Sequence, residues 1–467
     1  MPDRFPLKRD LFMISDDSIM AGGMDLPRTM RENAGMSCTV SPATVSSTEA
    51  NRSAADLPHL WLPYTQMQTA PFPVEAVRTS GSRITLADGR ELVDGVAAWW
   101  TACHGYSHPH IQQALIQQAS AMPHVMFGGM VHEPARRLAA RLAELLPGDL
   151  ERTFFTDSGS VAMEVAVKMA VQYHINRGTE GRTKMLSFRG GYHGDTLGMM
   201  SICDPEEGMH SLFAGILPKQ VLADLPVDDA STARLEALLE KEGHTIAAIV
   251  TEPLVQGAGG MLFHSPEVLR RLRELCDRFG LLLILDEIFT GFGRTGTMFA
   301  CEQANIVPDI VALSKALTGG TMALAATVAR RSVFEAFLST DGGKALMHGP
   351  TFMANPLACA VANASLDLFE QEPRLEQVAR ISDQLRRELE PCRTIPGVED
   401  VRVLGAIGVV ELEKIENPDV LRRAFVTHGT WIRPFRNIVY LTPAFTITPE
   451  DLSHLTSSIV TVLRDNA

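Results

Sequence analysis

The feature that most constrains the fold is an uninterrupted apolar run followed at once by an acid. Residues 281–285 are all Leu or Ile, and Asp286 comes directly after them. Such a run is typical of a strand buried on both faces of a parallel sheet. A second, shorter run, Asp309–Leu313, is followed by Ser314 and Lys315. Because open α/β sheets bind ligands at the carboxyl ends of their strands, we expect Asp286 and Lys315 to meet at that edge.

An acid and a lysine in this arrangement suit the cofactor pyridoxal phosphate (PLP). PLP needs a lysine for a Schiff base and an acid that keeps its pyridine nitrogen protonated, so that the ring can accept electrons. The alternatives are a buried ion pair between Asp286 and Lys315, or two unrelated surface charges. For a single Asp and Lys these alternatives would prevail, so the rest of the chain must support the PLP interpretation.

Size and composition indicate a globular protein. The 467 residues are 45% hydrophobic and 21% charged, as in globular proteins. A chain of this length can bury a large core, and we expect it to form two domains. A net charge of −13 argues against a general nucleic-acid or anionic-membrane binder. No apolar run approaches the roughly 18 residues of a membrane span. The seven cysteines form no C-x-x-C pair, so we expect reduced thiols and a cytoplasmic protein.

Two further features of the composition bear on organisation. Cys103 lies near His104, His108 and His110, but this spacing fits no common zinc pattern, so no metal is expected. Residues 1–56 lack apolar periodicity, and we expect disorder there. Their acids argue against a transit peptide, and no apolar segment suits secretion.

The remaining chain is predicted to form an α/β fold with two domains. An Asp88-Gly89 hairpin joins two strands within residues 83–94. Alternating strands and helices from 109 to 345 predict a large domain with a mostly parallel sheet covered by helices. Residues 57–108 and 346–467 would supply the two parts of a smaller α+β domain, with structure beginning near Leu60.

Small polar residues follow the strand predicted at 153–156, where a helix begins. Asp157, Ser158, Gly159 and Ser160 would leave backbone N–H groups facing an anion such as a phosphate, although a simple helix cap explains them equally well.

Aromatic and basic residues mark three other candidate positions. Tyr192 follows a glycine-rich strand end and offers a face for a planar ring, or simply packs its loop. Of the adjacent Trp99 and Trp100, at least one forms part of a binding-site wall, or they pack in the core. Arg433, flanked by apolar residues, would clamp a substrate carboxylate or a structural one.

The stretch Gly291–Gly296 matches G-x-G-x-x-G, the dinucleotide-binding fingerprint. That fingerprint should open a helix at once, whereas Thr297-Met298-Phe299 favours neither helix nor strand. An acid should also follow about twenty residues later, where this chain has Lys315. A nicotinamide-dependent dehydrogenase is therefore a remote alternative.

Taken together, these stretches resemble the class III PLP-dependent aminotransferases of fold type I. The resemblance rests on Asp286–Gly296 and Ser314-Lys315-Ala316, with Asp286 and Lys315 separated by 29 residues as in the family. It extends over about 60–441 and is closest to family members of biotin biosynthesis. The further segments that carry it are 61–65, 98–100, 124–129, 157–160, 191–195, 255–260, 348–352 and 431–435.

The resemblance implies a role for each matching residue and a ping-pong transfer through pyridoxamine phosphate. Lys315 would form the Schiff base, Asp286 would pair with the pyridine nitrogen, and Tyr192 would stack on the ring and touch substrate. A homodimer with shared active sites is implied, because two of the phosphate ligands come from the partner subunit. The phosphate would be bound by Gly159, Ser160, Pro350 and Thr351, and the small-molecule substrates by Tyr64, Trp99, Trp100, Tyr192, Lys315, Gly349 and Arg433.

Two positions depart from the family pattern. Phe289 stands where a small residue is expected, and Val131 where a threonine is expected. Phe289 affects the shape of the pocket rather than its chemistry. The alternatives within the family are an aminotransferase for ω-amino acids or diamines with a 2-oxo acid, or the use of lysine as amino donor.

Overall fold

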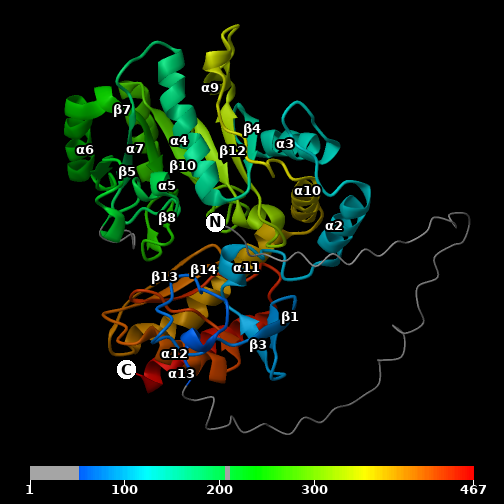
Figure 1. Ribbon diagram of the computed structural model, residues 1–467. Helices are drawn as coiled ribbons and strands as arrows, with labels where there is room; N and C mark the ends of the chain where they lie inside the picture. The colour runs from blue at the N-terminus through cyan, green and yellow to red at the C-terminus, as the bar shows by residue number, and fades with distance from the viewer. Residues whose placement is uncertain (1–51, 206–210, 467) are drawn as a thin grey trace, which may run out of the picture. The chain divides into compact units, whose positions relative to one another are not determined.

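The computed structural model describes residues 52–205 and 211–466 (Figure 1). The chain separates into two compact units, Met1–Phe72 and Pro73–Ala467. In the first unit, a short 3-10 helix, η2 (Ala54–Asp56), is capped by Ser53, whose backbone N–H donates to the Asp56 carboxylate at 2.7 Å. The rest of the segment predicted to be disordered, residues 1–51, lies outside the described residues. The sequence predicts that ordered structure begins near Leu60, whereas the 3-10 helix η2 already lies ahead of that residue.

The second unit contains a seven-stranded sheet in the order β4-β12-β11-β10-β7-β5-β6. The sheet is mostly parallel, which confirms the predicted fold class, and only β12 runs antiparallel to its neighbours. The strands are β4 (Leu150–Thr156), β5 (Lys184–Phe188), β6 (Val221–Ala223), β7 (Ile246–Thr251), β10 (Leu282–Asp286), β11 (Ile310–Leu313) and β12 (Ala325–Arg330).

Helices cover both faces of this sheet, as Figure 1 shows for α4 and α7. Leu282 and Ile284 of β10 join a core with α4 (Gly159–Asn176). Leu283 and Leu285 join the other core, with α7 (Pro266–Phe279). This two-sided burial explains why the strand is uniformly aliphatic. The remaining helices of this region are α2 (Pro109–Ala121), α3 (Glu133–Leu145), α5 (Leu197–Met200), α6 (Asp229–Glu242), α8 (Cys301–Ala304) and α9 (Arg331–Glu335).

Two smaller sheets lie in the second unit, and one of them combines residues from both of its ends. The predicted hairpin is confirmed, since β2 (Arg83–Leu86) and β3 (Glu91–Asp94) pair antiparallel. Beside them lie β1 (Ala76–Ser80) and β15 (Thr430–Trp431), the latter parallel to β3. The other sheet and the elements around it are β13 (Val398–Leu404), β14 (Ile407–Leu412), β16 (Ile438–Leu441), α11 (Arg374–Leu389), α12 (Pro418–Thr427) and α13 (Pro449–Asp465).

Several helix ends follow the predicted capping signals. α7 begins with a proline in its first turn and ends at Gly280 in the left-handed conformation, with φ 64°. α10 (Pro356–Gln371) begins after Asn355, whose side chain accepts from the N–H groups of Leu357 and Ala358. Among the described helices, none is both long and apolar enough to cross a membrane. The limits predicted for the two domains stay a prediction.

Candidate active site

Asp286 and Lys315 lie at the same edge of the large sheet. β10 and β11 are parallel, and Asp286, the last residue of β10, is level with Ala312 of β11. Lys315 follows two residues after the end of β11 and opens the 3-10 helix η5 (Lys315–Thr318). The parallel strands therefore deliver both groups to one edge, as the two apolar runs of the sequence predict.

A cavity of about 170 Å³ opens at this edge. The predicted site residues among its walls are Trp100, Gly159, Ser160, Tyr192, Asp286 and Lys315. Phe289, which is expected to affect the shape of the pocket, also lines the cavity. Further lining residues, for which the sequence predicts no role, are His193, Glu252, Ile288 and Ser314.

The Asp286 carboxylate is buried and fixed at both oxygens. Its Oδ2 lies 2.8 Å from Nδ1 of His193, and its Oδ1 accepts the backbone N–H of Ile288 at 3.2 Å. Burial alone would lower the pKa of His193, but the hydrogen bond and the charge of Asp286 outweigh it, and the pKa is raised. The carboxylate of Asp286 is thus held in a fixed position in the cavity wall.

Lys315 projects its amine into apolar surroundings. Its Nζ lies 4.7 Å from the centre of the Trp100 ring. Burial lowers the pKa of the amine, against the opposing charges of Asp286 and Glu252. A lowered pKa increases the unprotonated fraction, which is the form that attacks a carbonyl or accepts a proton.

The beginning of α4 lines the same cavity as Lys315 and is the candidate anion site. Ser158 caps the helix, its Oγ accepting the N–H of Val161 at 3.4 Å, and the first N–H groups of a helix have no partner within it. Ser160 Oγ accepts the N–H of Asp195 at 3.2 Å. Gly194, with φ 127°, packs so closely that a Cβ there would lie 2.1 Å from Ser160 Oγ. The backbone can therefore approach a phosphate closely here.

Tyr192 is held beside the cavity by a buried acid. Glu252 accepts the N–H groups of Tyr192 at 3.0 Å and Gly257 at 2.9 Å. Burial raises the pKa of Glu252 to about 7, although His193 acts to lower it. Glu252 directly follows the end of β7, and no local sequence motif marks it as part of the site.

Trp99 and Trp100 lie in an unusual left-handed turn. Residues 97–100 have φ between 44° and 75°, which is strained for side chains other than glycine. The buried Asp94 holds the turn, since its carboxylate accepts the N–H groups of Val96 at 2.8 Å and Ala98 at 3.0 Å. It also accepts the Tyr106 hydroxyl at 2.6 Å. Neighbouring residues in such a turn can point in different directions.

The two tryptophans meet different partners. The guanidinium of Arg433 lies 4.5 Å from the centre of the Trp99 ring. Trp100 packs on Phe289, with 4.2 Å between ring centres. Phe289 also fills the space above Gly257, where a Cβ would lie 2.9 Å from the phenyl ring. The large residue at position 289 thus forms part of the wall beside Lys315.

Six of the predicted residues do not line this cavity, and Trp99 and Arg433 are two of them. Gly349, Pro350 and Thr351 lie on the loop between η6 (Gly342–Lys344) and α10, and Gly349 and Thr351 are exposed. Tyr64 belongs to the first unit, where it is half exposed with φ 50°. The structure brings together the groups expected around the cofactor ring more completely than those expected around the substrate.

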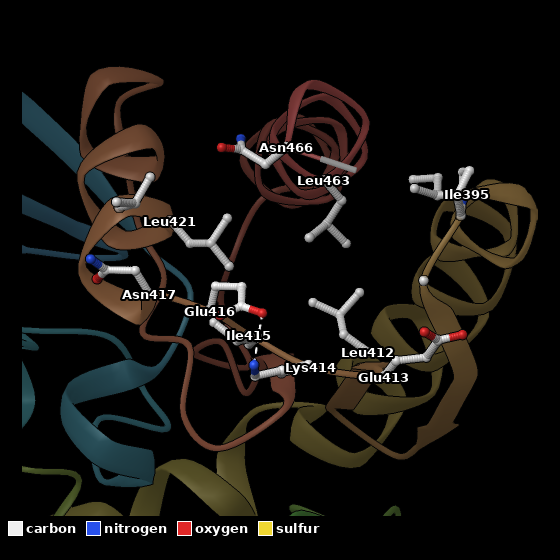
Figure 2. A pocket seen from close by; sticks show the side chains of 13 residues that line it. Ile395, Leu412, Glu413, Lys414, Ile415, Glu416, Asn417, Leu421, Leu463 and Asn466 are labelled. Atoms are coloured by element: carbon white, nitrogen blue, oxygen red, sulfur yellow. Dashed lines mark ion pairs between the residues drawn. The ribbon is translucent and has the colours of Figure 1, made fainter.

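A larger cavity, of about 480 Å³, lies elsewhere, among α12, α13 and the end of β14 (Figure 2). Its walls are mainly aliphatic, with an ion pair between Lys414 and Glu416 at 2.8 Å. None of the residues predicted for the site lines it. The side chains of that ion pair are 71% and 80% exposed, whereas the smaller cavity combines Lys315 with the buried Asp286 and the beginning of α4, so the smaller one is the candidate active site.

The groups around the smaller cavity fit PLP. They provide an amine, a buried carboxylate held by an imidazole, an aromatic side chain and a helix N-terminus. Each matches one part of the cofactor: aldehyde, ring nitrogen, ring face and phosphate. Elsewhere among the described residues, no group of three or more His, Cys, Asp or Glu side chains could hold a metal ion. His104, for which a metal role is weighed above, is instead bonded to Arg374 and Ser365.

Comparisons with known proteins agree with this chemistry. The family described as aminotransferase class-III matches residues 64–463. An adenosylmethionine-8-amino-7-oxononanoate aminotransferase of Mycobacterium leprae is 47% identical, over 91% of this chain and 99% of that protein. The Saccharomyces cerevisiae protein of the same name is 36% identical, over 88% and 95%.

Solved structures give the same result. A Methanocaldococcus jannaschii aminotransferase of that name has a TM-score of 0.83 and 30% identity, over 87% of this chain and 97% of that one. A PLP-bound amine transaminase from an uncultivated Pseudomonas species has a TM-score of 0.81 and 31% identity, over 87% and 98%. Fold and site define a PLP-dependent transferase of fold type I. The chain belongs to the class III aminotransferase family.

Proposed function

We propose that this enzyme transfers an amino group from S-adenosylmethionine to 8-amino-7-oxononanoate, giving the 7,8-diaminononanoate of biotin biosynthesis. The observation that carries the proposal is the match to relatives named for this reaction over nearly their whole length, 99% for the Mycobacterium leprae protein. The same chain places Lys315 and Asp286 at one edge of the sheet, as the chemistry requires.

When bound, PLP supplies an electron sink and carries the amino group between the two half-reactions. Lys315 is the residue that holds the cofactor and then moves a proton as a general base, a role favoured by its lowered pKa. Asp286, fixed by His193, pairs with the ring nitrogen. The N–H groups of Gly159 and Ser160 bind the phosphate, and Tyr192 lies against the ring.

The substrate side is formed by aromatic and basic residues. Arg433, stacked 4.5 Å from the Trp99 ring, binds the carboxylate of the keto acid, and the tryptophans bind its aliphatic chain. The family resemblance also implies Tyr64 and Gly349 as substrate-binding residues. Because one cofactor serves both substrates in turn, the kinetics are ping-pong.

The active enzyme is a homodimer with shared active sites. Two observations support this part of the proposal. Pro350 and Thr351, the phosphate ligands implied by the family resemblance, do not line their own chain's cavity. Large apolar side chains are also exposed on two loops, 124–132 and 346–355, as a buried interface requires. They are Met126 (58% exposed), Met130 (52%), Val131 (68%), Met347 (78%) and Phe352 (59%).

The enzyme works in the cytoplasm, where its thiols stay reduced. The six described cysteines are all buried and free, which suits a reducing compartment.

A half-reaction screen tests the proposed substrates. The holoenzyme is mixed separately with S-adenosylmethionine, lysine, ornithine and β-alanine, and the visible cofactor band is followed. The proposal predicts bleaching by S-adenosylmethionine, and turnover only with 8-amino-7-oxononanoate as acceptor. If lysine alone bleaches the band, the amino donor is lysine and not S-adenosylmethionine. Bleaching by ornithine or β-alanine, with a 2-oxo acid as acceptor, would favour the ω-amino acid alternative within the family.

A further inference from the structure

A chain of buried polar side chains lies behind the turn that carries Lys315. Arg374 Nε lies 2.9 Å from His104 Nδ1, and His104 Nε2 lies 3.0 Å from Ser365 Oγ. Ser365 Oγ in turn lies 3.4 Å from the carbonyl oxygen of Ala316, the residue after Lys315. These partners are 0–5% exposed and line neither cavity described above. Most buried polar groups in proteins are hydrogen-bonded, and these three side chains bond to one another and to the backbone.

The direction of every hydrogen bond in this chain is fixed by the arginine. A guanidinium only donates, so His104 Nδ1 must accept and the ring proton must be on Nε2. That proton is donated to Ser365 Oγ, which leaves the serine hydroxyl to donate to the Ala316 carbonyl. Burial, helped by Arg374, lowers the pKa of His104 to about 3, so the ring is neutral as this direction requires.

The His104 ring also contacts the other end of the turn. Gly319 closes η5 with φ 57°, and a Cβ there would lie 3.3 Å from His104 Cδ2 and 2.9 Å from Ile111 Cδ1. The edge of the imidazole packs against Phe369, with 4.7 Å between ring centres. The ring is thus fixed on several sides. It packs against the end of η5 at Gly319, and it is linked to the beginning of η5 through Ser365 and the Ala316 carbonyl.

Lys315 needs such support because its backbone is strained. Its φ of 45° lies in the left-handed region, which a lysine adopts only where its surroundings enforce it. We propose that His104 is a positioning residue: through Ser365 and the Ala316 carbonyl it holds η5 in the conformation that points the Lys315 amine into the active-site cavity. This inference rests on the proposed role of Lys315.

The test compares His104→Ala, Ser365→Ala and His104→Gln in the full-length holoenzyme. Glutamine can accept from Arg374 and donate to Ser365, so it can replace the imidazole. Four quantities are measured. They are the rate of cofactor loss on dilution, monitored through the visible band, and the values of kcat, KM and the thermal midpoint. His174→Ala is the matched control, since His174 is also buried and bonds the carbonyl of Ala247 at 3.0 Å, away from η5.

We expect His104→Ala to lose cofactor at least about tenfold faster and to lower kcat about 10- to 100-fold, with little change in KM, because a displaced amine is badly oriented. Ser365→Ala should change both quantities in the same direction, and His104→Gln should restore most of the loss. The control should lower the thermal midpoint without affecting cofactor loss.

Unchanged cofactor loss and kcat in His104→Ala would overturn the inference, as would a His104→Gln variant as impaired as His104→Ala. A lower thermal midpoint with normal kcat would reduce His104 to a packing role. If His104→Ala does not fold, Ser365→Ala provides the test, because it removes only the hydroxyl that connects His104 to the Ala316 carbonyl. Lys315→Ala separates the two proposals: if it keeps a borohydride-reducible band, the role of Lys315 itself is wrong.

Discussion

Asp286 and His193 are joined by a 2.8 Å hydrogen bond beneath the active-site cavity, and each side chain is at most 5% exposed. A carboxylate buried alone would be driven toward its neutral form. Although burial acts to lower the pKa of the His193 imidazole, the hydrogen bond to Asp286 and the charge of Asp286 raise it. Asp286, for which we propose pairing with the cofactor ring nitrogen, is therefore held in place by a buried partner.

Asp286→Asn is expected to lower kcat about 10²- to 10³-fold, in line with the loss of one preorganised electrostatic contact at a reaction centre. His193→Gln should have a smaller effect in the same direction, because the carboxylate remains. Steady-state kinetics with both substrates measure this. Equal activity of Asp286→Asn and the unaltered enzyme would exclude the assigned role.

Gly194→Ala should weaken cofactor binding. The added methyl group would meet Ser160 Oγ at 2.1 Å, and φ 127° is itself unfavourable for alanine. The displaced Ser160 belongs to the phosphate site, so we expect the Kd for PLP to rise at least about tenfold, a cost of about 1.4 kcal/mol. Fluorescence titration of the variant measures it. Gly215→Ala is the control, because nothing lies within 4 Å of a Cβ there, and equal affinities in the two variants would contradict the prediction.

Arg433→Ala should weaken binding of the keto acid by roughly 2–4 kcal/mol, the range for truncating one partner of a buried charged pair. Only the acceptor KM should rise, since the donor is converted in the other half-reaction. Arg423→Ala, at an exposed position of α12, is the control. An unchanged acceptor KM would show that Arg433 serves the structure rather than the substrate.

His104→Gln should make the protein less sensitive to acid. Burial and Arg374 lower the pKa of His104 to about 3 from its ordinary value of 6.5. The unfolded state therefore binds one more proton within this window, so His104 contributes stability above pH 6.5 that is lost as the pH falls toward 3. Replacing the ring should reduce the pH slope of the unfolding free energy by up to about 1.4 kcal/mol per pH unit.

Urea unfolding between about pH 7 and 5 measures this slope. His428→Gln, at an exposed helix end, is the control and should keep the slope of the unaltered protein. Parallel curves for His104→Gln and the unaltered protein would mean that His104 is not buried in its neutral form.

Local patterns were sufficient for the part of the site that lies at strand and helix ends. Asp286 and Lys315 follow aliphatic runs, and Gly159 and Ser160 follow a strand and open a helix, so topology alone brings them to one edge. The G-x-G-x-x-G stretch was correctly discounted. Residues 291–296 lie in turns, and Arg294 is buried, donating to the carbonyls of Ala406 and Pro443.

Other features depend on residues far apart in the chain. β12 was not predicted as a strand because Ala325–Arg330 is rich in alanine, and its antiparallel direction follows from the sheet rather than from its own residues. The left-handed turn of Trp99 and Trp100 depends on Asp94 and Tyr106. The contacts of His104 span more than 260 positions, so no periodicity in the sequence could reveal them.

The central claim is that the Lys315 amine binds the cofactor covalently, and one variant tests it most directly. Lys315→Ala should be folded, should lack the visible band that borohydride reduces in the unaltered enzyme, and should have no transaminase activity. Lys241→Ala, at an exposed position of α6, should keep both properties. A Lys315→Ala protein that remains active, or keeps a band that borohydride reduces, would contradict the account.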